Sequence, residues 1–245
     1  MRHLSQPELP PQRTPRARPA VQPRPRVAWR DVPAETVGCS GATAWRRLRD
    51  WTEAGVWSRL HAALLTELRR AELLGLDDCA VDGSHVPALK GGSRRGPSPV
   101  DRARPGSKHH LIVDRHGTPL AVTLTGGNRH DVTQMLPLLD AVPAIRGLRG
   151  RPRRRPRRLY ADRGYDFDKY RRVLWKRGIK PMIARRGVAH GSGLGKVGWV
   201  VERAFAWLHQ FKRLRIRYER RADLHQGLLE LACSLICLRR LRTSF

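Results

Sequence analysis

Cysteine is scarce in this chain, which has only four cysteines. Cys233 and Cys237 lie one helical turn apart, but no second cysteine or histidine pair at zinc-finger spacing accompanies them. We therefore interpret both as buried packing thiols rather than as half of a metal site.

The chain also lacks a long hydrophobic run. No secretory hydrophobic region occurs near the amino terminus, and the longest apolar stretch, residues 227–238, is too short to cross a bilayer and contains Glu230. These absences exclude a membrane-spanning protein, and they predict a soluble, intracellular protein with no membrane partner.

Acidic residues are the third deficit. The 21 Asp and Glu residues are outnumbered by 49 Lys and Arg, so the formal net charge is +28 and the pI is near 11.6. A surplus of this size predicts a polyanionic partner. The 40% hydrophobic content is enough for one substantial core and a small accessory domain.

Composition divides the chain into three parts. Residues 1–26 are rich in proline and arginine without helical or strand periodicity, which predicts a disordered basic tail. Residues 27–75 carry apolar positions at helical spacing and predict a small helical region that contacts DNA, or equally a helical pair packed on the main domain. Residues 76–241 predict the main domain.

The main domain reads as an α/β fold. Its expected order is a strand, a hairpin of two strands, a helix, a strand, a helix, a strand and a helix, which predicts a mixed sheet flanked by helices. Asp131 and Asp166 are expected to cap two of these helices. An arginine-rich loop, residues 145–158, precedes the strand that ends at Asp162, and it is either a phosphate-binding loop or a solvated one; we favour the first.

Three acidic residues are candidates for a catalytic site. Asp82 and Asp162 each end a short apolar run that predicts a buried strand, and reactive groups collect where strands end in open α/β sheets. Glu202 lies beside the apolar stripe formed by Val201 and Phe205 in a helical run. Against this interpretation, an Asp shortly before a Gly is usually a turn residue, and Asp162 stands two residues before Gly164.

Carboxylates gathered at one sheet edge need a cation. At about 4 Å and an effective dielectric constant near 20, each pair repels by about 4 kcal/mol, and without a cation at least one carboxyl would hold its proton. Mg²⁺ prefers such oxygen ligands. Two ions about 3.5–4 Å apart can activate the attacking oxygen and stabilise the leaving oxygen at a phosphodiester.

Four segments resemble bacterial insertion-sequence transposases of the DDE type, in insertion-sequence family five. They are AVDGSHV around Asp82, GSKHHLIVDRHGTPLAVTLTGGNRHD at 106–131, LYADRGYD around Asp162, and VVERAFAWLHQFKRLRIRYER around Glu202. The resemblance implies a ribonuclease-H-like fold, a helical region at 27–75 that is shorter than in related proteins, and Asp82, Asp162 and Glu202 as catalytic, metal-binding acids. It also implies Mg²⁺, with Mn²⁺ as a substitute, cleavage of double-stranded DNA at element ends, and strand transfer into target DNA.

A second set of residues is expected to contact DNA or to support the acids. These residues are Asn128, His130, Arg203, Lys212, Arg213, Arg153, Arg154 and Arg155. Because two element ends must be brought together, we expect a homodimer, located in the bacterial cytoplasm with the nucleoid. Two alternatives stay open: a catalytically idle DNA-binding remnant, and a related nuclease of the same fold that cuts without joining.

Overall fold

The computed structural model describes residues 28–187 and 194–243. The predicted disordered tail, residues 1–26, lies outside them. The chain divides into two compact units, Met1–Ala44 and Trp45–Phe245, and the boundary falls inside helix α2 (Gly41–Glu53). The first unit contains two short elements, η1 (Trp29–Asp31) and α1 (Ala34–Val37). The predicted domain boundaries at residues 26 and 75 stay predictions.

Helix α3 (Val56–Arg70) belongs to the second unit and to its core. Gly55 precedes it with φ 65°, a left-handed conformation that glycine adopts without strain and that separates α3 from α2. The helix buries Leu65 and Leu68 and packs against α8 (Ala222–Arg242). His61 Nε2 lies 2.9 Å from the carbonyl oxygen of Pro119, so α3 is also tied to the sheet.

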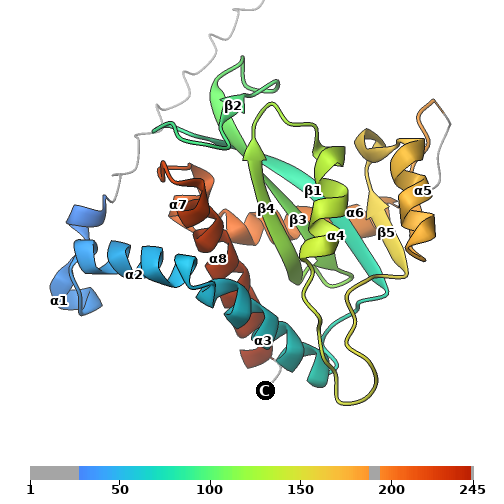
Figure 1. Cartoon of the computed structure of the whole chain (residues 1–245), viewed down its shortest axis with the longest axis horizontal. Helices are drawn as coiled ribbons and strands as arrows, with labels where there is room; N and C mark the ends of the chain where they lie inside the picture. Colours follow the sequence, from blue (N-terminus) through green and yellow to red (C-terminus); the bar gives the residue numbers. More distant parts are fainter. Residues whose placement is uncertain (1–27, 188–193, 244–245) are drawn as a thin grey trace, which may run out of the picture. The chain divides into compact units, whose positions relative to one another are not determined.

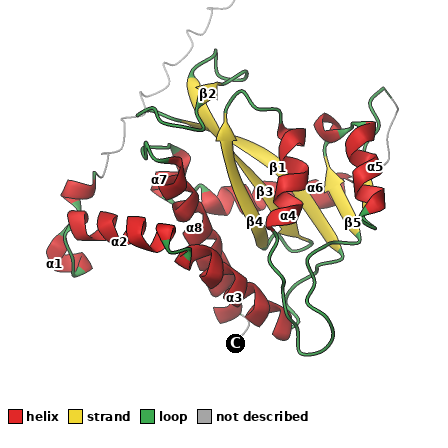
Figure 2. Ribbon diagram, viewed as in Figure 1, coloured by secondary structure: helices red, strands yellow, loops and turns green. Residues whose placement is uncertain are grey.

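The second unit is built on a mixed sheet (Figure 2). The order β2, β3, β1, β5, β6 runs across the sheet, and β4 pairs with β3. β1 is antiparallel to β3 and parallel to β5, and β5 is parallel to β6. The strands are β1 (Asp78–Pro87), β2 (Gly96–Pro97), β3 (Pro105–Asp114), β4 (Pro119–Gly126), β5 (Arg158–Ala161) and β6 (Lys180–Ile183).

Helices cover both faces of the sheet (Figure 1). One core joins Val81 and Ala161 to α3, α4 (Met135–Ala141) and α5 (Asp168–Lys176). A second core joins Ala80 and Tyr160 to α6 (Leu194–Leu208) and α8. Neighbouring strand residues enter opposite cores because side chains alternate along a strand. The predicted mixed sheet flanked by helices is confirmed.

The cysteine and membrane predictions can be compared with this fold. Cys233 and Cys237 are fully buried in α8 as free thiols, so their interpretation as packing residues is confirmed. Within 28–187 and 194–243, no helix is long and apolar enough to span a bilayer.

Two predicted helix caps are wrong. Asp131 is the first residue of η2 (Asp131–Gln134), after His130 as the cap, and its carboxylate accepts hydrogen bonds from Lys108 instead. Asp166 precedes Phe167, which caps α5, and its carboxylate pairs with Arg171 at 2.7 Å. Lys108 lies 23 residues from Asp131, and the backbone N–H of Arg186, 20 residues from Asp166, also donates to the Asp166 carboxylate.

Candidate active site

Asp82 and Asp162 occupy matching positions on neighbouring parallel strands. The register of β1 and β5 pairs Ala80 with Tyr160, and each acid lies two residues further along its strand direction. Because side chains alternate, both acids lie on the side of Ala80 and Tyr160, which is the side that α6 covers. Adjacent strands are about 4.8 Å apart, so the register brings the two carboxylates side by side.

Asp82 does not end its strand, contrary to expectation. β1 continues to Pro87 because it keeps pairing with β3, in which Leu111 is the partner of Asp82. The pairing with β5 stops at Ala80. Asp82 therefore lies where β1 loses its parallel neighbour, and Asp162 follows the last residue of that neighbour.

Glu202 reaches this edge from α6. The helix packs against β1, β3 and β5, with Val201, Phe205 and Leu208 buried, as their spacing predicts. Glu202 is exposed beside this buried stripe. A third carboxylate therefore projects from the layer that covers the acids of the two strands.

The pKa of Asp82 reports the crowding of these acids. Burial is the largest cause that raises it, and the negative charges of Asp162, Asp131 and Glu202 raise it further, to about 6. The backbone N–H of Gly83 donates to Asp82 Oδ1 at 2.7 Å and opposes this shift. Asp162 and Glu202 thus both lie within electrostatic reach of Asp82.

Asp162 is both a turn residue and a site residue. Its Oδ1 accepts a hydrogen bond from the backbone N–H of Gly164 at 2.8 Å, which caps η3 (Arg163–Tyr165). The turn therefore uses one of the two carboxylate oxygens, and its hydrogen bond holds the Asp162 side chain in place at the end of β5. Asp162 remains exposed.

Tyr165 was missed by sequence reasoning. It is 1% exposed, and its hydroxyl has no hydrogen-bond partner among the described residues. Burial raises its pKa well above the usual range, and the charges of Asp82, Asp131 and Asp162 add to the rise. A neutral phenol therefore lies beneath the acids. Its place immediately after the turn Arg163-Gly164 was the available signal.

A fourth carboxylate, Asp131, was also missed as a site residue. A Cβ atom at Gly83 would lie 2.8 Å from Asp131 Oδ1, so only glycine leaves room for it beside Asp82. Lys108, 5% exposed on β3, donates to Asp131 Oδ1 at 2.9 Å. His110 Nδ1 is 3.7 Å from the same oxygen, and burial lowers the pKa of His110 to about 4.

The loop that carries Asn128 and His130 lies near the same edge. Both residues are exposed between β4 and η2. The ring of His130 meets the ring of Phe167 edge to face, with centroids 5.7 Å apart, and η2 contacts η3. This places His130 close to the turn that holds Asp162, whereas the Asn128 side chain lies against Gly96 of β2.

The arginine-rich loop lies at the other end of β5. It precedes the strand, whereas Asp162 follows it, so the loop does not adjoin the acid as expected. Arg153 pairs with Asp77 at 2.5 Å, and its backbone bridges Ile145. Arg154 and Arg155 are exposed. DNA binding by these three arginines stays a prediction.

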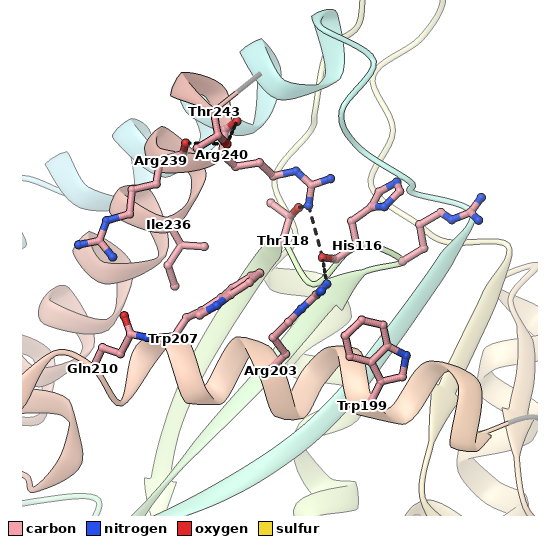
Figure 3. A pocket seen from close by; sticks show the side chains of 11 residues that line it. His116, Thr118, Trp199, Arg203, Trp207, Gln210, Ile236, Arg239, Arg240 and Thr243 are labelled. Carbon is pink, nitrogen blue, oxygen red and sulfur yellow. Dashed lines mark hydrogen bonds between the residues drawn. The ribbon is translucent and has the colours of Figure 1, made fainter. Parts of the chain in front are cut away.

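The remaining basic candidates follow Glu202 in the chain. Lys212 is exposed on α7 (Lys212–Arg215), and Arg213 pairs with Glu219 at 2.9 Å. Arg203 lies between Trp199 and Trp207 in a pocket (Figure 3). Its Nη2 donates to the carbonyl oxygen of His116 at 2.6 Å.

The donor set fits a hard divalent cation by its chemistry. Asp82, Asp162 and Glu202 offer carboxylate oxygens. Burial first, and then the neighbouring negative charges, raise the pKa of Asp82, and a bound cation would relieve the cost of ionising it. Within the described residues, no group of three or more His, Cys, Asp or Glu side chains is already spaced to hold a metal ion.

Comparison with known proteins decides the family. Residues 74–237 match the family described as "Transposase DDE domain". The chain belongs to this family. A Burkholderia cepacia protein, described as the proposed transposase of insertion sequence element IS402, is 64% identical over 152 residues, which are 62% of this chain and 72% of that protein. The chain is therefore a bacterial DDE insertion-sequence transposase.

Other similar proteins cover less or are more distant. A 16.2 kDa Burkholderia cepacia protein of insertion element IS402 is 51% identical over 74 residues, 30% of this transposase and only half of that protein. The catalytic domain of the Mos1 mariner transposase aligns with a TM-score of 0.30 and 10% identity, over 75% of this chain and 90% of that one. The pre-cleavage Mos1 transpososome aligns with a TM-score of 0.29 and 13% identity, over 84% and 72% respectively.

Proposed function

We propose that this chain, as a transposase of insertion-sequence family five, cuts DNA at the ends of its element and joins them to target DNA. The observation that carries the proposal is that Asp82 and Asp162 each lie two residues beyond the paired residues Ala80 and Tyr160, with Glu202 within electrostatic reach of Asp82. Membership of the DDE transposase family supports it.

In this proposal Asp82, Asp162 and Glu202 hold divalent metal, which is Mg²⁺ with Mn²⁺ as a substitute. When bound, the metal activates the attacking oxygen and stabilises the leaving oxygen of an in-line displacement. Asp82 supplies a carboxylate whose pKa near 6 leaves it mainly ionised above pH 7. The Gly164 N–H fixes Asp162 Oδ1, so this carboxylate is oriented before substrate arrives.

Duplex DNA is the proposed partner, held by two copies of the chain. The surplus of 49 Lys and Arg over 21 Asp and Glu favours a polyphosphate. Asn128, His130, Lys212 and Arg213 are the proposed contacts near the acids. Two element ends must meet before joining, so a homodimer is the proposed assembly.

The test is a strand-transfer assay on a labelled duplex that carries the element's terminal repeat. Wild type and Asp162→Asn are compared in Mg²⁺ and in EDTA. Metal-dependent cleavage and joining that the substitution abolishes would support the proposal. Binding without cleavage by wild type would indicate an idle DNA-binding remnant, and cleavage without joined product would indicate a nuclease.

A further inference from the structure

A second cavity lies apart from the three acids. It has a volume of about 630 Å³, and residues of α6, α8 and the turn between β3 and β4 line it (Figure 3). None of Asp82, Asp162 and Glu202 lines it. Pockets of about 300–1,000 Å³ are typical of sites for small molecules or single ligand groups.

The lining of this pocket is cationic. Arg115, Arg203, Arg239 and Arg240 line it, and among the residues that the structure describes no Asp or Glu does. Arg203 and Arg240 donate to the same acceptor, the carbonyl oxygen of His116, at 2.6 and 3.4 Å. Two guanidinium groups that converge on one neutral carbonyl create a local positive potential, which favours an anion with several acceptor oxygens.

The same pocket presents aromatic surface. The guanidinium of Arg203 lies 4.3 Å from the ring centroid of Trp199 and 4.9 Å from that of Trp207. The buried Arg203 Nε has no hydrogen-bond partner among the described residues. Trp199 is 50% exposed, although a tryptophan usually buries most of its surface. Indole surface beside guanidinium groups suits a ligand that combines a phosphate with a planar ring.

We infer that this pocket binds one nucleotide of a DNA strand. The base packs on Trp199, and the phosphate pairs with Arg240, which shares the carbonyl oxygen of His116 with Arg203. An acidic peptide would pair with the arginines but would gain nothing from the indoles. The pocket lies outside the proposed metal site, so its occupancy does not require cleavage.

The experiment measures base recognition separately from charge. The full chain is titrated in EDTA with a labelled single-stranded hexanucleotide and with an abasic hexamer that has the same phosphates. Wild type is expected to bind the base-bearing strand at least about fivefold more tightly, because each stacked base contributes substantially to such sites. Trp199→Ala should remove this preference, and Trp199→Phe should restore part of it.

Matched controls keep the test specific. Trp175 is 57% exposed on α5, outside the pocket, so Trp175→Ala should keep the wild-type preference. Arg240→Gln should weaken binding of both hexamers, because it removes the phosphate contact. Thermal unfolding of each variant confirms that it is folded.

Two results would overturn the inference. If folded Trp199→Ala and Trp199→Phe both distinguish the hexamers as wild type does, the base does not bind on Trp199. If dAMP competes as strongly as the hexanucleotide, the ligand is a free nucleotide rather than part of a strand. Because the assay contains EDTA, neither result bears on the proposed metal chemistry.

Discussion

Replacement of Asp82 by Asn should stabilise the metal-free protein at neutral pH. The folded state raises the pKa of Asp82 from 3.8 to about 6. Between these values the folded chain keeps a proton that the unfolded chain has lost, so the free energy of unfolding falls as pH rises. The fall is about 1.4 kcal/mol per pH unit, or about 3 kcal/mol across the window, and it is complete above about pH 6.

The assay is urea unfolding at pH 4, 5, 6 and 8 in EDTA. The free energy of unfolding of Asp82→Asn should lack this part of the pH dependence. At pH 8 it should exceed that of wild type by up to about 3 kcal/mol. Mg²⁺ should reduce the difference in free energy of unfolding between Asp82→Asn and wild type, because only wild type offers all three carboxylates to the ion. Asp168→Asn is the control, since Asp168 is 71% exposed on α5.

The refuting result is equally specific. If wild type and Asp82→Asn show the same pH dependence in EDTA, ionisation of Asp82 costs nothing. The acids would then not crowd one another, and the electrostatic argument for a cation would fail.

Three further substitutions are tested by urea unfolding, two beside the acids and one, at His61, where α3 meets the sheet. Gly83→Ala should lose about 1–3 kcal/mol, because its Cβ would lie 2.8 Å from Asp131 Oδ1; wild-type stability would contradict this. Lys108→Met should lower the free energy of unfolding by about 2 kcal/mol. This is less than the usual cost of breaking a buried ion pair, because the Asp131 side chain is 37% exposed. Burial lowers the pKa of His61 to about 4, so the contribution of His61 to the free energy of unfolding should fall as pH drops from about 6.5 to 4, opposite in sign to that of Asp82. The difference between wild type and His61→Gln should show this fall.

The sequence predicted the features that depend on local pattern. Short apolar runs located β1 and β5, and the spacing of Val201, Phe205 and Leu208 gave the buried face of α6. Because strands and helices bury apolar residues with fixed periods, these patterns also placed the three acids near one sheet edge.

Features that depend on distant partners were not predicted. Asp131 and Asp166 resemble helix caps locally, but Lys108 and Arg171 hold their carboxylates. β1 extends beyond Asp82 because β3 supplies a partner as far as Pro87, which no local pattern shows. The arginine-rich loop was placed beside Asp162 by proximity in sequence, although strand direction separates the two.

The pocket around Arg203 shows the same limit. Trp199, Arg203 and Trp207 recur at intervals of four residues, which indicates one helix face. Arg239 and Arg240 come from α8, and only the packed structure brings them to that face. Arg203 was expected to contact DNA or to support the acids, and its guanidinium lies among these residues.

The most direct test of the proposed site is strand joining in Mg²⁺ by single-residue variants. Asp82→Asn, Asp162→Asn and Glu202→Gln should each reduce joining at least about 100-fold, because each removes a charged metal ligand, while Asp168→Asn should join at the wild-type rate. Full joining by any one of the three folded variants would contradict the assignment of that acid and the triad as a whole.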